Sequence, residues 1–455
     1  MTRFPLLVGL TLAALVAAPA AEAATPVPAK APATTGSRWW HQLGDPDLAE
    51  LVERALAGNL DIEQAAARLD RAAAASRSVS AALLPNLGAS GSAAAVRQSL
   101  ADPAIRPFAT LPGFPREQER FSAALTASWE IDLFGGGARR RGARATAEAA
   151  AAELEAARVV VAAETATSWL TVRELQARRL NLRAQLDALD AQARIIARRV
   201  AAGTRPPLDA DRIAAERAGQ AATAAVLDGR IAAEVERLGV LIANPAVARA
   251  LAEQRAGVPA PAAPADVDDL PVSIEARPDV VAAELRLAAA DAAVAAARSL
   301  RFPRLSLGGL LASVAFAPSA LFTGAAQSAQ GNAGISLPLL DFGRIDAEIA
   351  DARGSRRAAW AGLRKVALDA AADVTRSAAI LSSRRQDQAA RQQALDALAA
   401  SRTRVGAAYA AGSADLGSLL DVERSRLGAE DGLIVARSET MKALVSVFRA
   451  SAQLR

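Results

Sequence analysis

Few side chains in this sequence have the types and spacing that catalysis or metal binding requires. The 455 residues include one histidine, His41, and no cysteine, so histidine pairs and thiolates are missing. Gly135-Gly136-Gly137 precedes a predicted helix, but it lacks the GxGxxG and GK[ST] patterns of phosphate-binding loops. We therefore expect no enzymatic activity, no cofactor and no metal site. We expect a packing or surface role for His41 and a strand-to-helix bend at the glycines.

The charge balance is mildly basic, because 53 Lys and Arg residues face 48 Asp and Glu residues. The arginines are spread along predicted helices, and aromatic residues make up only 4% of the chain. A nucleic-acid site would need a basic patch with aromatic side chains that stack on bases. We therefore expect no nucleic-acid partner.

The N-terminus has the pattern of a secretory signal peptide. Arg3 precedes an apolar stretch from Leu6 to Ala18, and Ala21-Glu22-Ala23 has the small-x-small pattern of a cleavage site. We expect residues 1–23 to be removed, because the stretch is shorter than the roughly 20 residues that span a bilayer. An N-terminal membrane anchor is the alternative. Since no other uncharged stretch is long enough, any crossing of a membrane must use strands closed into a barrel.

The longest predicted element is a helix from Ala143 to Ala202, a run without glycine or proline. At 1.5 Å per residue it would be about 90 Å long. Apolar residues recur along it at intervals of three and four, which is the seam of a coiled coil. The seam residues are Val172, Leu175, Leu182, Leu186, Leu189, Ile196 and Val200.

The stretch before this helix, Phe121 to Phe134, alternates apolar and polar residues. Period-two alternation predicts a strand with one apolar and one polar face. Asp45-Pro46 opens an earlier helix, as a cap and a first-turn proline do. The other elements that we expect are a strand 86–96, a loop 99–119, a helix 208–243, a linker 256–272, and strands 304–316 and 332–340.

The two halves of the chain repeat one layout. Asp61-Ile62 matches Asp279-Val280 at an offset of 218 residues, and Ala202-Gly203 matches Ala411-Gly412 at an offset of 209. The coiled-coil seam keeps its phase at the same offset. We therefore expect two tandem repeats, 24–255 and 273–455, with hairpins at about 86–134 and 304–341. Four strands are too few to close a membrane barrel, which needs about eight, so membrane strands require oligomerisation. A trimer is our inference, and counting alone leaves dimer and tetramer open.

These motifs resemble the TolC-type outer-membrane efflux ducts, in the branch that serves resistance-nodulation-division drug pumps. The resemblance covers nearly the whole mature chain in order. It rests on Trp39-Trp40, Asp45-Pro46-Asp47-Leu48, Leu83-Leu84-Pro85, Trp129 to Gly135, Gly203 to Asp209, Arg277-Pro278-Asp279-Val280, Phe302-Pro303, Leu340 to Arg344, and Gly412 to Asp421.

The resemblance implies a mainly α fold with membrane β structure. Three chains would share a 12-stranded β-barrel in the outer membrane of a Gram-negative bacterium, four strands from each, in contact with lipid. Their long helices would form a coiled-coil α-helical barrel in the periplasm that opens by untwisting at its tip. The implied function is passive exit of small molecules, with an inner-membrane pump and a periplasmic adaptor as partners. Since the sequence has no cysteine, we expect an unlipidated member.

The family places a ring of carboxylates in the second tip turn, and the aligned residue here is Asp421. Three such carboxylates near an axis would repel one another and attract cations. Many relatives have a second constricting residue, an Asp or a Leu, one turn earlier. The aligned positions here are Ser418 and Gly417. This departure from the family pattern puts a two-layer gate in doubt. Asp415 is a substitute candidate. A solvated surface role is the alternative for both aspartates.

Arg205 and Arg212 lie by the first tip turn and are candidates to pair with Asp421 in the closed state, or to be surface charges. Trp129 and Phe134 are predicted anchors at the membrane interface.

Two other functions stay open: an outer-membrane channel for type I protein secretion, and a periplasmic coiled-coil structural or adaptor protein. The transported substrate is not predicted, because selectivity in this class belongs to the pump.

Overall fold

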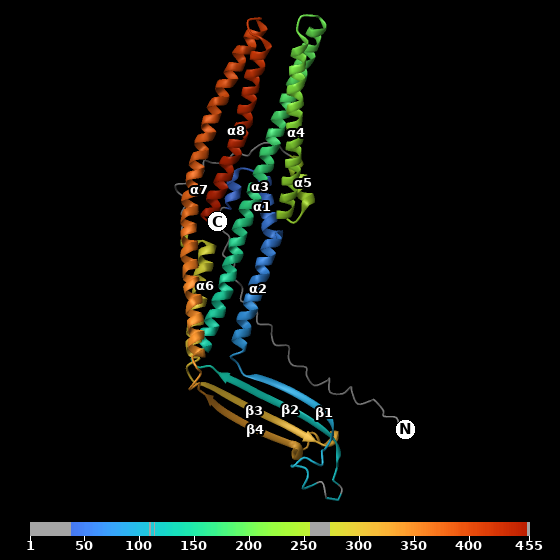
Figure 1. Cartoon of the computed structure of the whole chain (residues 1–455), viewed down its shortest axis with the longest axis vertical. Helices are drawn as coiled ribbons and strands as arrows, with labels where there is room; N and C mark the ends of the chain where they lie inside the picture. The colour runs from blue at the N-terminus through green and yellow to red at the C-terminus, as the bar shows by residue number, and fades with distance from the viewer. Residues whose placement is uncertain (1–37, 109–110, 113, 255–273, 453–455) are drawn as a thin grey trace, which may run out of the picture.

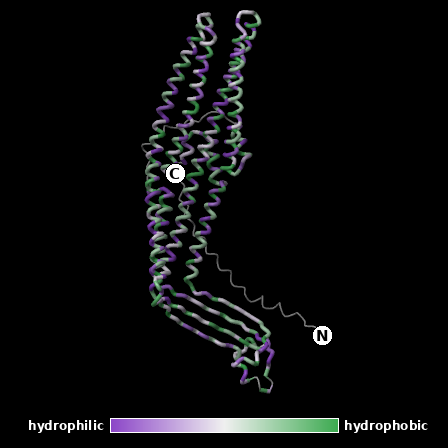
Figure 2. The backbone as a smooth tube through the Cα atoms, in the orientation of Figure 1, coloured by the Kyte–Doolittle hydropathy of each residue, from purple (hydrophilic) through white to green (hydrophobic). Residues whose placement is uncertain are grey.

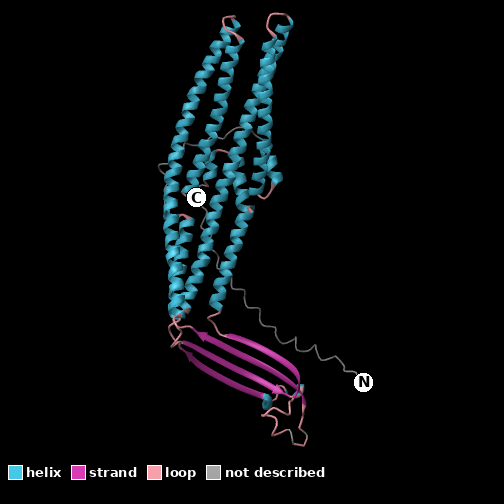
Figure 3. Ribbon diagram, viewed as in Figure 1, coloured by secondary structure: helices cyan, strands magenta, loops and turns pink. Residues whose placement is uncertain are grey.

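The computed structural model describes residues 38–108, 111–112, 114–254 and 274–452. The predicted signal peptide 1–23 and linker 256–272 lie outside these residues. The molecule is a long bundle of helices with a four-stranded sheet at one end and two helix-to-helix turns at the other (Figures 1 and 3). We call the end with the two turns the tip.

The element order repeats, as the sequence predicts. The first half contains η1 (Trp39–Leu43), α1 (Pro46–Gly58), α2 (Leu60–Ala81), β1 (Asn86–Arg97), β2 (Glu117–Ile131), α3 (Gly136–Ala201), α4 (Pro207–Leu241) and α5 (Pro245–Gln254). The second half contains η3 (Ile274–Ala276), α6 (Pro278–Ser299), β3 (Arg304–Ala315), η4 (Pro318–Ala320), η5 (Gly324–Ala326), β4 (Gln327–Ser336), α7 (Arg344–Ala410) and α8 (Leu416–Ala450).

The long helix α3 begins seven residues before the predicted start. Gly135 donates its backbone N–H to the Asp132 carboxylate, 2.7 Å away, and the helix starts at the next residue. Three glycines in the first turns made the predicted start late, because glycine disfavours helix in isolation. The predicted seam packs against α4: Leu175 and Leu182 are buried with Leu227, and Ile196 is buried against Ile213.

Each long helix is covered by two shorter helices that meet end to end. α3 packs against α2 near the sheet and against α4 near the tip, and α7 packs against α6 and α8 in the same way (Figure 1). α3 also packs against α6 and α8, which joins the two halves along its length. The joints bury helix ends, whose backbone groups need partners. Asn59 supplies them in the first half: its oxygen caps α2 by accepting from Asp61 N–H at 2.9 Å, and its amide donates to the Leu241 carbonyl at 2.8 Å.

Arg277 closes the equivalent joint in the second half. Its guanidinium donates to the Ala450 carbonyl at the end of α8, 2.7 Å away, and to the Asp279 carboxylate, also at 2.7 Å. Arg277 follows Asn59 by 218 residues, and Ala450 follows Leu241 by 209. Both offsets are those of the sequence repeat, so the two halves use the same connection with different side chains.

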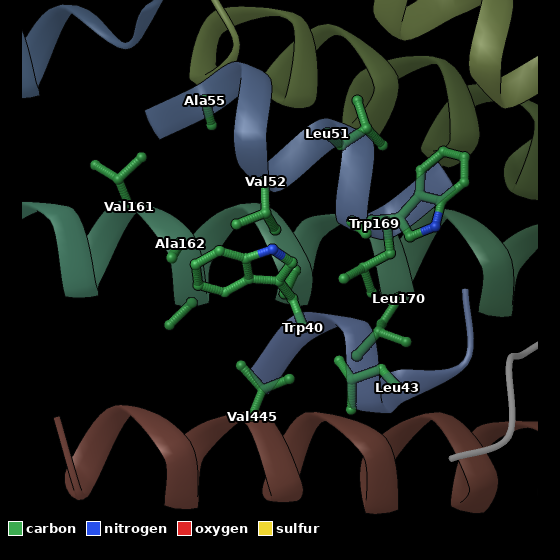
Figure 4. Close-up of a cluster of buried hydrophobic side chains, with 14 of the residues drawn as sticks. Trp40, Leu43, Leu51, Val52, Ala55, Val161, Ala162, Trp169, Leu170 and Val445 are labelled. Atoms are coloured by element: carbon green, nitrogen blue, oxygen red, sulfur yellow. The ribbon is translucent and has the colours of Figure 1, made fainter. Parts of the chain in front are cut away.

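The main core lies at the level of these joints. Trp40 and Leu43 of η1 pack among α1, α3 and α8, beside Val52, Trp169 and Val445 (Figure 4). The Trp169 indole donates to the Asp45 carboxylate at 2.8 Å, and the Arg173 guanidinium lies 4.3 Å above the Trp169 ring. The Trp-Trp and Asp-Pro-Asp motifs therefore serve to attach the start of the described chain to the middle of α3.

The sheet has the order β1-β2-β3-β4, and all neighbouring strands are antiparallel. The predicted strand 332–340 is wrong in position, since β4 runs from Gln327 to Ser336. The first half of β4 is rich in Gln, Ser and Gly and shows little apolar alternation; pairing with β3 determines that it is a strand. Leu337-Pro338 follows directly, and proline lacks the N–H that a ladder needs.

The two faces of the sheet differ in chemistry. Odd-numbered residues share one face and even-numbered residues the other, because the register pairs odd with odd in every ladder. The odd face is mostly apolar, including Leu87, Leu125, Leu307, Leu311 and Ile335, all exposed in the chain. The even face is mostly Ser, Thr, Gly, Asn and Gln. Most of each strand is white or green in Figure 2.

No helix in the described part of the chain combines the length and the apolar character needed to cross a membrane.

We predict that Arg277→Ala lowers thermal stability. The change removes a buried, charged hydrogen bond to the end of α8, worth about 1.5–3 kcal/mol in typical proteins, and leaves Asp279 without its cation. The measurement is thermal unfolding of the detergent-solubilised protein, followed by circular dichroism. The control is Arg286→Ala on α6, which removes an exposed ion pair with Glu153 of α3 and should cost at most about 1 kcal/mol. Equal melting temperatures for the two variants would contradict the role of Arg277.

Candidate functional site

The two tip turns have the same backbone design. Gly203 and Gly412 have φ angles of +69° and +77°, a left-handed conformation that strains residues with a Cβ. Thr204 donates its backbone N–H and its hydroxyl to the Arg199 carbonyl, both at 2.9 Å. Ser413 repeats this with the Ala408 carbonyl, at 2.9 and 3.1 Å. Glycine is thus required at the point where each pair of long helices reverses.

Asp415 begins α8 as its N-cap. Its carboxylate accepts the backbone N–H of Ser418 at 2.7 Å. Hydrogen bonds from the Ser418 backbone and hydroxyl, with the charge of Arg205 as a further cause, hold the pKa of Asp415 below its ordinary value. Of the predicted second-constriction positions, Ser418 supplies this cap hydrogen bond, and Gly417 lines a groove beside Asp421. Asp415 therefore has a structural role in the first turn of α8.

Asp421 lies one turn and a half into α8, with 77% of its side chain exposed. Its carboxylate is 3.8 Å from the Arg424 guanidinium, and Arg424 also lies 2.8 Å from Glu216 on α4. Within the described residues, Arg424 is the cation paired with Asp421. The carboxylate itself remains open to solvent.

Neither predicted partner of Asp421 forms an ion pair with it among the residues that the structure describes. Arg205 pairs with Asp209 one turn along α4, at 3.6 Å. Arg212 lines the same groove as Asp421, and no ion pair joins it to any residue that the structure describes. The groove has a volume of about 850 Å³ and runs between α3, α4 and α8.

Besides the pair of Arg424 with Glu216, further polar contacts join the α3–α4 pair to the α7–α8 pair, and sequence reasoning missed them. Arg178 makes a bidentate pair with Asp431, at 2.8 and 3.0 Å. Glu174, mostly buried, accepts from Lys442 at 2.9 Å. The third contact is Arg199 to the Tyr409 hydroxyl at 3.2 Å. The partners are more than 200 residues apart, so no sequence spacing could reveal them.

The predicted interface anchors lie at the opposite end, where strands meet helices. The Trp129 indole donates to the Leu83 carbonyl at 2.9 Å, next to the end of α2. Phe134 is half exposed and stacks on Phe302, with ring centroids 4.7 Å apart. The stack joins the first half of the chain to the second at the base of the sheet.

His41 lies on η1, exposed, with its Nε2 3.3 Å from the Glu53 carboxylate. Among the described residues, no group of three or more His, Cys, Asp or Glu side chains is arranged to hold a metal ion.

We predict that the first turn of α8 loosens in acid. Because the folded-state pKa of Asp415 is lowered, its cap contributes fully above the ordinary value of 3.8 and is lost as the pH falls through the lowered pKa. The measurement is amide hydrogen exchange of residues 415–420 from neutral pH to pH about 3, corrected for intrinsic rates. Asp415→Asn, the control, keeps a capping oxygen and should show no such pH dependence. Constant protection in the unmodified protein would contradict the prediction.

Comparisons with known proteins agree with this geometry. The family model described as "Outer membrane efflux protein" matches residues 51–244 and 270–453, one match in each half. The chain is 28% identical over 426 residues to the pyoverdine export outer membrane protein OpmQ of Pseudomonas aeruginosa, covering 91% of this chain and 86% of that protein. It is 30% identical over 423 residues to the outer membrane protein OprJ of the same species, covering 90% and 85%.

Among solved structures, the outer-membrane channel OprN matches with a TM-score of 0.78 and 27% identity, covering 92% of each chain. The CmeC outer membrane channel of Campylobacter jejuni matches with a TM-score of 0.82 at 19% identity, which bears on the fold alone. The predicted family and fold class are confirmed: this chain belongs to the outer membrane efflux protein family.

Proposed function

We propose that this protein is the outer-membrane exit duct of a tripartite efflux system, which conducts small molecules to the exterior without catalysis of its own. The observation that carries the proposal is the sheet at one end of the helical bundle. One face of this sheet is apolar, and the other carries small polar residues. The first suits lipid, and the second suits a water-filled passage. The energy for transport would come from an inner-membrane pump.

The duct requires more than one chain. β1 and β4 are the edges of the four-stranded sheet, and unpaired edges cannot face hydrocarbon. Three copies would supply twelve strands, above the roughly eight needed for a membrane barrel. β1 of one protomer would then pair with β4 of the next, and the long helices would continue the barrel as a tunnel. We therefore propose a homotrimer.

The tip is the proposed gate. In a trimer, three exposed Asp421 carboxylates would lie near the axis and hold cations there. Opening requires the α7–α8 pair to move away from the α3–α4 pair. The contacts of Arg178 with Asp431 and of Lys442 with Glu174 hold the two pairs together and so favour the closed state.

A periplasmic adaptor and an inner-membrane pump of the resistance-nodulation-division type are the proposed partners. The names of relatives, which include pyoverdine export and multidrug resistance proteins, support efflux over type I protein secretion. An independent periplasmic adaptor is disfavoured, because its strands would not need a continuous exposed apolar face.

The function is tested by deletion of the gene and a susceptibility panel of small toxic compounds. Sensitivity to several compounds, restored by the gene in trans, supports efflux. Unchanged susceptibility together with loss of a secreted protein would identify the secretion alternative. A protein that fractionates as soluble without detergent would overturn the duct.

We predict that Asp421→Asn weakens cation preference in planar bilayers. Removal of three carboxylates near the axis lowers the local cation concentration, so the ratio of cation to anion permeability should fall roughly two-fold at low salt. The control is Asp415→Asn at the N-cap of α8, where the carboxylate is engaged in a hydrogen bond to the backbone. The gate assignment fails if both variants give the unmodified reversal potential.

We also predict that Arg178→Glu increases single-channel conductance. The change places a carboxylate opposite Asp431 and beside Glu174, so repulsion replaces an attractive contact between the two helix pairs. The charge-exchanged double variant Arg178→Glu with Asp431→Arg should restore part of the original conductance. Equal conductance in the single variant and the unmodified protein would show that this contact does not hold the tip.

A further inference from the structure

The sheet carries almost no charge along its length. Residues 86–96, 121–129 and 305–335 contain no Asp, Glu, Lys or Arg. Charged residues of the strands therefore lie only at the two ends of the sheet. Because the central part is neutral, an uncompensated charge on the even-numbered face at one end of the sheet is not opposed by charges farther along that face.

Arg120 is such a charge. It lies in β2 opposite Ala94, at the end of the sheet that is far from the helices (Figure 1). Ser92 and Ser122 lie beside Arg120 on the even-numbered face. Their hydroxyls are 2.7 Å apart, which confirms that these two side chains share that face. The Arg120 side chain is exposed and makes no ion pair or side-chain hydrogen bond with any residue that the structure describes.

The other strand charges are compensated or face the opposite side. Glu130 and Arg304, also on the even-numbered face, lie at the helix end and are 3.3 Å apart. Arg97 and Glu117 form a pair at 3.5 Å on the odd-numbered face, at the same end as Arg120. Glu119 also lies on the odd-numbered face, opposite Ala95. Arg120 thus leaves one net positive charge per chain on the face of small polar residues.

We propose that Arg120 makes the outer end of the passage favour anions. This inference rests on the proposed duct, in which the even-numbered face lines the passage and three copies of Arg120 form a ring. A ring of cations raises the local concentration of anions and lowers that of cations. The substrate class that it favours is small molecules with a carboxylate or another negatively charged group.

The proposed ring lies at the end of the molecule opposite the Asp421 carboxylates, so the passage has a cation-attracting tip and an anion-attracting mouth. Exposed charges act over about 10 Å at 0.1 M salt and about 3 Å at 1 M. The two sites are separated by the length of α3, roughly 100 Å for a helix of 66 residues. Their effects on permeation are therefore independent and can be measured separately.

The test is the reversal potential of the reconstituted full-length protein in planar bilayers under a potassium chloride gradient near 0.1 M. Arg120→Gln should lower the ratio of chloride to potassium permeability by roughly two-fold, and the difference should vanish near 1 M because the charge is then screened. Arg120→Lys should keep the original ratio. Arg97→Gln, which removes an arginine at the same end but on the odd-numbered face, is the matched control and should also leave the ratio unchanged.

An unchanged ratio in Arg120→Gln at low salt, with normal single-channel currents, would overturn the inference and leave the duct intact. An equal shift in Arg97→Gln would also overturn it, because the effect would then belong to the whole mouth rather than to the even-numbered face. Absence of channel activity in the unmodified protein would instead defeat the proposed function itself.

Discussion

The structure depends on how buried helix ends are satisfied halfway along the molecule. α3 and α7 are each more than 60 residues long, and no single helix of similar length covers either one. Two shorter helices do so in series, which buries the end of one and the start of the next. Asn59 and Arg277 bind these backbone groups directly. Without these side chains, backbone N–H and C=O groups at the joints would be buried without hydrogen-bond partners. Each such group would cost free energy comparable to a lost hydrogen bond.

This arrangement separates the molecule into two regions with different mechanics. Near the joints, η1 and α1 pack against α3, and the aromatic core with Trp40 and Trp169 holds the two halves together (Figure 4). Toward the tip, each half is only a pair of helices. The contacts between the pairs combine polar pairs with a small apolar cluster, in which Tyr409 and Leu420 pack against Ile196 and Ile213. Polar contacts near the surface contribute little individually, which supports the proposal that the two pairs separate at the tip.

Along the sheet, charged side chains lie only at the two ends, and the strand segments between them are neutral. The even-numbered face of the sheet presents mostly small hydroxyl, amide and glycine residues, which in the proposed duct would let water and solutes pass without strong binding. Asp421 stands at one end of the molecule and Arg120 at the other. Since neither side chain is needed to hold the chain together, substitutions at these positions can change permeation without changing the fold.

The sequence by itself determined the elements whose signals are local: the alternation in β2, the unbroken run that became α3, the Asp45 cap, the tip glycines, and the repeat at offsets of 218 and 209 residues. It placed β4 wrongly and missed α5, because Gln, Gly and Ser carry little strand signal and because Asn244-Pro245 both ends one helix and starts another.

Only the tertiary structure decided which side chains meet across the two halves. The pairs Arg178–Asp431 and Arg277–Ala450 join residues 253 and 173 positions apart, and the capping role of Asp415 depends on where α8 begins. Sequence periodicity identifies the face on which a residue lies, but not the partner that folding brings to that face. The register of the four strands, which sets Arg120 apart from Arg97, is likewise a property of the folded sheet.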